Sequence, residues 1–185
     1  MEHFYQNIHG WCGFKNLYAR IVEQTEPPSH FVEVGAWLGK STSIMAVEIL
    51  NSNKDIKFDV VDTWDGRGDT EYHAKTKEGT LYKDFLANME PVIDVVNPIR
   101  QTSVEASKLY ENNTLDFIFI DASHDYENVK LDLKSWFPKL KKGGIIAGHD
   151  YAWGPGVKKA VDEFFNHPSQ LFPINPTDRD WETKI

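Results

Sequence analysis

The sequence has little of several features that mark common protein classes. It holds one cysteine, Cys12, in 185 residues, so an internal disulfide is excluded and a reducing compartment is expected. No apolar run approaches the ~18 residues that span a bilayer. The first residues, Met1–Phe4, lack the basic and then apolar order of a secretion signal. These absences predict a soluble, cytoplasmic protein.

Positive charge is also in short supply. The chain carries 20 Lys and Arg against 28 Asp and Glu, a formal net charge of −8. A surface of this sign repels nucleic-acid backbones and anionic lipid, so we expect neither a general nucleic-acid binder nor a membrane-surface protein. With 41% hydrophobic residues the chain can bury a core, and its length fits a single domain over 1–185.

Apolar patterns along the chain alternate between strand and helix periodicity. The expected strands cover 31–34, 57–61, 95–99, 115–120 and 145–148. The expected helices cover 14–26, within an N-terminal helical segment 1–28, and then 41–50, 82–89 and 157–165. A further helix holds Val129, Leu133, Trp136, Phe137 and Leu140 and ends at Gly143-Gly144. Strands separated by helices predict a three-layer α/β sandwich with a mostly parallel sheet. The C-terminal tail, with Leu171–Ile174 and Trp181–Ile185, predicts an antiparallel edge.

Ligands bind to such sheets at the carboxyl ends of the strands. The residues expected there are Glu33-Val34-Gly35, Asp62-Thr63-Trp64, Thr102-Ser103, Asp121-Ala122-Ser123-His124 and His149-Asp150. Most of these ends carry an acid, which costs free energy unless the acid has a partner. We therefore look for function at this edge of the sheet.

A glycine-containing loop follows the first expected strand. Gly35 and Gly39 allow a tight turn and a close approach of the backbone to a ligand. Their spacing matches neither a dinucleotide-binding loop nor a phosphate-binding P-loop. Glu33 would repel a pyrophosphate but suits a cation, and Asp62 is placed for ribose hydroxyls. Together they indicate a nucleoside ligand that bears a positive charge.

At this point the sequence resembles the class I S-adenosylmethionine-dependent methyltransferases. The loop Glu33-x-Gly35-x-x-x-Gly39 resembles their first motif, and Asp62 resembles their second. The segments 120–126 and 143–151 resemble a small branch related to metal-dependent O-methyltransferases of catechols and macrolide sugars, and to the cephalosporin-hydroxylase-like group. The resemblance implies a Rossmann-like fold of the seven-stranded type. It also implies methyl transfer from S-adenosylmethionine to a hydroxyl of a small molecule or sugar, with Mg²⁺ or Mn²⁺ as a candidate second cofactor.

The resemblance further implies roles for individual residues. Those for the cofactor are Glu33, Gly35, Ala36, Trp37, Gly39, Ser41, Asp62, Thr63, Trp64, Ser103 and Asp121. Asp62 would bind the ribose, Trp64 would lie beside the adenine, and Ser103 would meet the adenine edge. Asp121, His149 and Asp150 would hold the metal, and His124 would be the general base. His149 replaces an acid of the relatives, which favours Mn²⁺ or Fe²⁺, or leaves only two protein ligands.

Plainer interpretations of these residues stay open. Asp121 and Asp150 could cap helices, and His124 could be an exposed residue of a first turn. Trp136 and Phe137 are expected in the core.

The irregular segment 65–80 and the function as a whole also have alternatives. The segment, with Asp69, Glu71 and His73, is either a solvated loop or a lid over the substrate. The chain could be a nucleoside- or S-adenosylmethionine-binding protein without activity, or another Rossmann-sheet enzyme such as an oxidoreductase. The acceptor and the oligomeric state do not follow from the sequence.

Overall fold

The computed structural model describes residues 1–66, 80–152, 155–165 and 181–184. The expectation for Leu171–Ile174 lies outside these residues, as does the expectation of a lid at 65–80 for all but its ends. Asp69, Glu71 and His73 belong to that undescribed part. Within the described ranges, no helix combines the length and the apolar character needed to cross a membrane.

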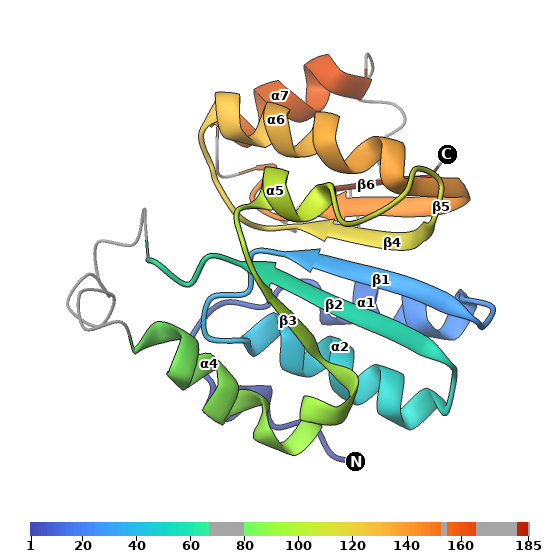
Figure 1. Cartoon of the computed structure of the whole chain (residues 1–185), viewed down its shortest axis with the longest axis vertical. Helices are drawn as coiled ribbons and strands as arrows, with labels where there is room; N and C mark the ends of the chain where they lie inside the picture. The colour runs from blue at the N-terminus through green and yellow to red at the C-terminus, as the bar shows by residue number, and fades with distance from the viewer. Residues whose placement is uncertain (67–79, 153–154, 166–180, 185) are drawn as a thin grey trace.

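The centre of the molecule is one six-stranded sheet with the strand order β3-β2-β1-β4-β5-β6 (Figure 1). Its strands are β1 (Ser29–Val34), β2 (Ile56–Asp62), β3 (Asn97–Arg100), β4 (Leu115–Ile120), β5 (Leu140–Gly148) and β6 (Trp181–Lys184). β1 to β5 pair in parallel, and β6 pairs with β5 in the antiparallel direction. The predicted α/β fold with a C-terminal antiparallel edge strand is therefore confirmed.

Helices cover both faces of the sheet, which completes the three layers (Figure 1). On one face lie α1 (Lys15–Gln24), α2 (Lys40–Ser52) and α4 (Leu81–Met89), and on the other α5 (Ser103–Ser107), α6 (Tyr126–Trp136) and α7 (Pro155–Phe165). Short 3₁₀ segments are η1 (Tyr5–Asn7), η2 (Glu90–Val95) and η3 (Phe137–Lys139). In β4, Phe117 and Phe119 join one apolar core and Ile118 and Ile120 the other, because side chains of a strand alternate between faces.

The expected helix that ends at Gly143-Gly144 is wrong in its second half. α6 ends at Trp136, and η3 contains Pro138, which has no N–H to continue a helix. β5 begins at Leu140 and includes both glycines. Leu115 pairs with Leu140 but Phe117 pairs with Ile145, so the extra residues of β5 form a bulge, where Gly143 has φ +84°.

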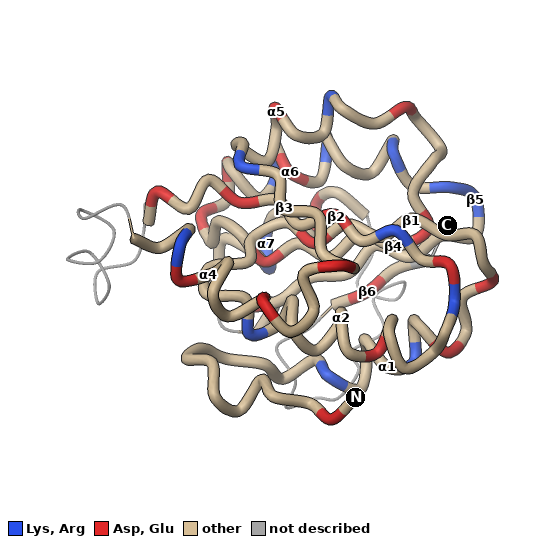
Figure 2. The backbone as a smooth tube through the Cα atoms, turned by 60° about the horizontal axis from the view of Figure 1, so that its bottom comes forward, with Lys and Arg blue, Asp and Glu red and all other residues tan. Residues whose placement is uncertain are grey.

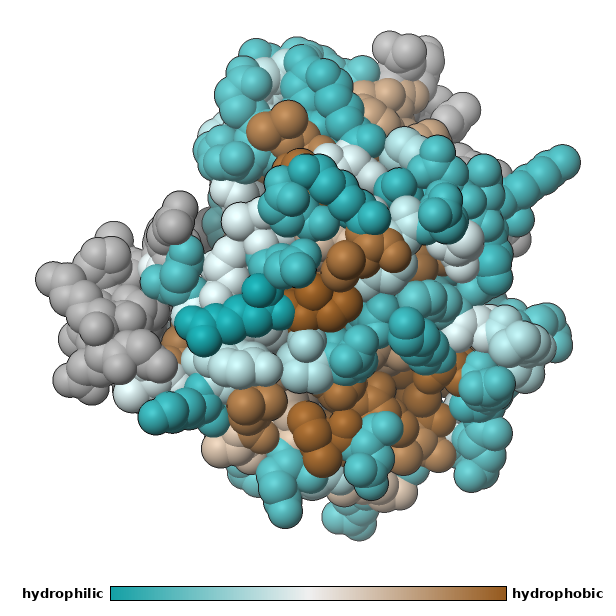
Figure 3. All heavy atoms as spheres, in the orientation of Figure 1, coloured by the Kyte–Doolittle hydropathy of each residue, from teal (hydrophilic) through white to brown (hydrophobic). Residues whose placement is uncertain are grey.

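Charge and apolar surface are distributed differently over the molecule. Acidic and basic positions are interspersed along the described backbone (Figure 2). On the face shown in Figure 3, hydrophobic side chains gather on the lower half, over α2 and the segment leading into β3. The exposed Ile93 of η2 belongs to that segment.

Candidate active site

The loop from β1 to α2 has a backbone conformation that residues with a Cβ atom rarely adopt. Gly35 has φ +93°, and a Cβ atom there would lie 2.1 Å from the carbonyl oxygen of Asp121. Gly39 has φ +86°, and Trp37 between them has φ +47°. Glycine at position 35 thus lets the end of β1 lie directly against the end of β4, which brings the loop beside Asp121.

Asp62, at the end of β2, holds this loop in place. One carboxylate oxygen accepts hydrogen bonds from the backbone N–H groups of Ala36 and Trp37, each at 2.9 Å. The other oxygen accepts from the N–H of Trp64 at 2.7 Å. Because a carboxylate offers about four acceptor positions, about one remains for a ribose hydroxyl. The predicted ribose contact is compatible with the structure, whereas the hydrogen bonds from Asp62 to the loop were not predicted.

Glu33 lies beneath the loop and is 1% exposed. Its carboxylate accepts the hydroxyls of Tyr18 at 3.0 Å and Thr42 at 2.5 Å. Burial raises the pKa of Glu33 to about 7, although hydrogen bonds from Ser41 and these hydroxyls oppose the shift. Glu33 therefore joins α1 and α2 to β1 below the loop instead of facing outward.

Two predicted cofactor residues are engaged elsewhere. Trp64 is 1% exposed and packs on Tyr82 and Phe85, so the structure does not bring its ring to the surface of the site. Ser103 donates its hydroxyl to Asp132 at 2.5 Å and accepts from the indole N–H of Trp136 at 2.9 Å. Their predicted places near the adenine have no support in these contacts.

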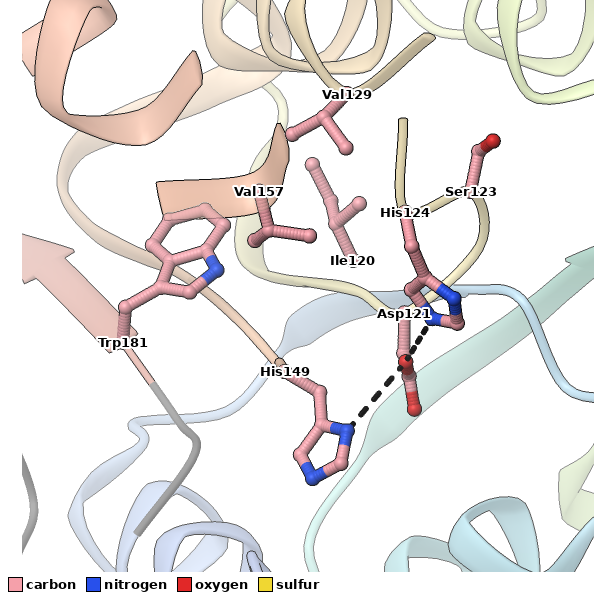
Figure 4. Close-up of a pocket in the computed structure, with 8 residues that line it drawn as sticks. All are labelled: Ile120, Asp121, Ser123, His124, Val129, His149, Val157 and Trp181. Atoms are coloured by element: carbon pink, nitrogen blue, oxygen red, sulfur yellow. Dashed lines mark ion pairs between the residues drawn. The ribbon is translucent and has the colours of Figure 1, made fainter. Parts of the chain in front are cut away.

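A cluster of two carboxylates and two imidazoles lies where β4 and β5 end, and Figure 4 shows three of its members, Asp121, His124 and His149. His124 Nε2 is 2.9 Å from Asp150 Oδ2 and 3.9 Å from Asp121 Oδ1. His149 Nδ1 is 3.3 Å from the same Asp150 oxygen and 3.7 Å from the same Asp121 oxygen. The alternative that Asp121 caps α6 is wrong, because Asp125 does so by accepting the N–H of Asn128. The structure thus brings together all four residues that the sequence assigned to metal and proton chemistry.

Charge pairing sets the protonation of this cluster. Asp121 and Asp150 raise the pKa of His124 to about 10. Burial lowers the pKa of His149, but the same carboxylates outweigh it and raise the value to about 10. These raised pKa values oppose the predicted role of His124 as a general base, which needs an imidazole nitrogen without a proton.

Comparison with known proteins adds the family. A family model described as a methyltransferase domain matches residues 32–151, more than half of the chain. The chain belongs to this methyltransferase domain family. The resemblance to class I S-adenosylmethionine-dependent methyltransferases is confirmed, and the matched region contains the glycine loop, Asp62 and the four-residue cluster.

Individual relatives of this methyltransferase domain are distant. The uncharacterized protein y4gI of Sinorhizobium fredii is 27% identical over 148 residues, which are 80% of this chain and 16% of y4gI. The chain thus spans less than a fifth of that relative. The O-methyltransferase NovP has a TM-score of 0.68 at 22% identity, over 92% of this chain and 78% of NovP. CalS11, a TDP-rhamnose 3′-O-methyltransferase, has a TM-score of 0.61 at 18% identity, over 92% and 76% of the two chains. At these identities the structures show a shared fold.

The cluster at the end of β4 and β5 has the donor atoms of a divalent cation site. Asp121, His124 and Asp150 each offer one ligand atom, and these atoms lie within 4.8 Å of one another. His149, which the sequence assigned as a ligand, lies beside this group with its Nδ1 toward both carboxylates. Two carboxylates with an imidazole suit Mn²⁺ or Fe²⁺ better than they suit Mg²⁺, which prefers oxygen ligands only.

The sequence interpretation assigned no site residue to the segment that precedes α1. Residues 8–14, which precede α1, pack against the site. Lys40 Nζ donates to the carbonyl oxygen of Ile8 at 2.9 Å, and the ring of Phe14 lies 5.3 Å from that of His149. The signal that could have revealed this segment is its aromatic content, with His9, Trp11 and Phe14 in six residues.

Proposed function

We propose that the protein transfers the methyl group of S-adenosylmethionine to a hydroxyl oxygen of a small molecule or sugar. The observation that carries this proposal is the cluster of Asp121, His124 and Asp150 beside the glycine loop. It offers a cation site and a proton acceptor next to the place where the family binds its methyl donor. The fold shared with NovP and CalS11 supports oxygen as the acceptor atom.

The reaction moves one methyl group and one proton. The bond between sulfur and methyl breaks as the bond between the acceptor oxygen and methyl forms, which leaves neutral S-adenosylhomocysteine. The hydroxyl proton passes to a base, for which His124 is the candidate. Holding donor and acceptor in line supplies much of the acceleration, since proximity alone removes a large part of the barrier.

Two sets of residues would prepare the reactants. Asp62 and the Gly35–Gly39 backbone would hold the cofactor, while Asp121 and Asp150, with His149 beside them, would hold a divalent cation and leave His124 for the proton. Such a cation would polarise an acceptor hydroxyl and lower its pKa. While both carboxylates face the imidazoles, the high pKa of His124 keeps its proton in place. His124 can act as a base only when these carboxylates are engaged by other positive charge.

The test follows methyl transfer with and without metal. The purified protein is given S-adenosylmethionine with a labelled methyl group and a panel of sugars, polyols and catechols, and products are read by mass spectrometry. We expect label on an acceptor oxygen, more with Mn²⁺ than with EDTA. Full activity in excess EDTA would remove the metal from the proposal. Label on nitrogen or carbon acceptors alone would remove O-methylation.

A further inference from the structure

The segment 8–14 connects the two halves of the candidate site. At one end, a Cβ atom on Gly10 would lie 3.2 Å from the ring of Trp37, so the backbone runs directly against the glycine loop. At the other end, Phe14 contacts His149 of the cation cluster. Three residues of chain span at most roughly 10 Å, so Trp11 lies close to both.

Trp11 presents a large aromatic surface at this position. Its side chain is 68% exposed, more than any other large hydrophobic residue in the described part of the chain. It is held in place from one side, because its ring stacks on that of Trp37 with centroids 6.0 Å apart and planes 18° apart. His9 meets the Trp37 ring edge-on at 5.4 Å. The indole is therefore supported yet open to solvent.

The cavity beside the cation cluster is too small to hold the ring of an acceptor. The cavity lined by Asp121, His124 and His149 has a volume of about 10 Å³, about what one water molecule needs (Figure 4). The buried apolar side chains of Val129, Val157 and Trp181 also line this cavity, which has no room for a ring, so the ring of an acceptor must rest on the surface around the cluster. The net charge of −8 disfavours a ring that carries an anionic group.

We propose that Trp11, supported by Trp37, is the subsite that binds the acceptor's ring, and that the acceptor is a neutral ring with a flat, weakly polar face. This inference rests on the proposed function. The face is either the C–H face of a pyranose or an aryl ring, since both stack on indole. Trp11 determines specificity here and takes no part in the chemical step.

The test uses ¹⁹F NMR of the protein labelled with 5-fluorotryptophan. The variant Trp11→Phe identifies the Trp11 resonance by its loss. Methyl α-L-rhamnopyranoside is the sugar probe, catechol the aryl probe, and glycerol the control without a ring. Each is titrated with and without S-adenosylhomocysteine. We expect one ring probe to shift the Trp11 and Trp37 resonances in a saturable way and glycerol to leave them in place.

Kinetics on an acceptor found by the labelling assay give a second measurement. Trp11→Ala should raise the acceptor's KM about 3- to 10-fold with little change in kcat, and Trp11→Phe should restore most of the loss. Leu109→Ala is the matched control, because Leu109 is also exposed, at 58%, and follows α5 on the opposite face of the sheet.

The two proposals fail in different ways. Absence of binding to S-adenosylhomocysteine would overturn the proposed function, while the resonance shifts would still decide the ring subsite. Cofactor binding together with Trp11 and Trp37 resonances that neither ring probe moves would overturn the subsite alone. An unchanged KM in Trp11→Ala would do the same.

Discussion

Glu33 and Asp62 show how differently two carboxylates serve the same loop. Asp62 accepts three backbone N–H groups and fixes the path of the loop above it. Glu33 lies below, accepts hydroxyl groups only, and has a pKa raised to about 7 by burial. The three N–H groups stabilise the carboxylate of Asp62 directly, whereas the contacts of Glu33 leave its buried charge poorly compensated.

Glu33→Gln tests this at the residue scale. The folded pKa of about 7 lies above the ordinary value of 4.5, so the folded protein loses stability as the pH rises from 4.5 to 7. The shift corresponds to about 3 kcal/mol. We expect urea unfolding to show Glu33→Gln more stable than the parent at pH 8, with the gain absent at pH 5. Glu105→Gln, at an exposed position, should show no such pH dependence, and an equal gain at both pH values would contradict the burial argument.

His124→Ala tests proton transfer. Removing a positioned base lowers turnover by ~10²–10⁴-fold, and the cofactor affinity should stay near that of the parent. Because Asp121 and Asp150 raise the pKa of His124, the parental rate should increase with pH as the imidazole loses its proton. Stopped assays over a pH series measure both effects. A His124→Ala rate equal to that of the parent would pass the role to another group, with His149 the next to test.

At the scale of elements, the site is built from segments that meet only at strand ends. The loop after β1 touches Asp121 after β4, and the segment before α1 reaches His149 after β5. α7 contributes from outside the sheet. A Cβ atom on its Gly156 would lie 2.6 Å from the carbonyl oxygen of His124. The start of α7 therefore sets where His124 stands.

Asp62→Ala should loosen the β1–α2 loop and the cofactor together. The change leaves the N–H groups of Ala36, Trp37 and Trp64 without their acceptor and removes the one that a ribose would use. We expect S-adenosylmethionine binding to weaken by roughly 2–3 kcal/mol in calorimetry. Asp65→Ala, at an exposed position three residues on, is the control and should bind normally. Unchanged affinity in Asp62→Ala would remove the ribose assignment.

Gly156→Ala should act on catalysis through position alone. The added methyl group has to displace the backbone at His124. We expect turnover to fall about tenfold or more, because a catalytic group that is moved from its place lowers the rate. S-adenosylhomocysteine affinity, read by calorimetry, should not change, because the glycine loop lies away from α7. Parental turnover in this variant would show that the loop carrying His124 adjusts without cost.

At the scale of the whole molecule, cofactor binding should be visible as stability. A ligand at 100 times its Kd adds about 2.7 kcal/mol to the free energy of unfolding. We expect S-adenosylhomocysteine to raise the melting temperature and NAD to leave it unchanged, since the glycine loop lacks dinucleotide spacing. Stabilisation by NAD instead would favour the oxidoreductase alternative.

Much of this architecture could be predicted from the sequence because it follows local patterns. β4 occupies the residues expected for it, because polar residues follow its apolar run directly and mark where the strand ends. The prediction that Gly143-Gly144 ends a helix is wrong because glycine serves both at helix ends and in bulges, and only the pairing of β5 with β4 distinguishes the two. The full rise in the pKa of His124 could not be predicted either, because besides the nearby Asp121 it depends on Asp150, far along the chain.

Cys12 has a consequence for solution work. It is the one thiol of the chain, it is half-buried, and it follows Trp11 in the segment over the candidate site. A maleimide or bimane reagent therefore has a single attachment point, with no background labelling to engineer away. Two indoles nearby can quench a bimane excited state, so emission from the conjugate would report on the mouth of the site in real time.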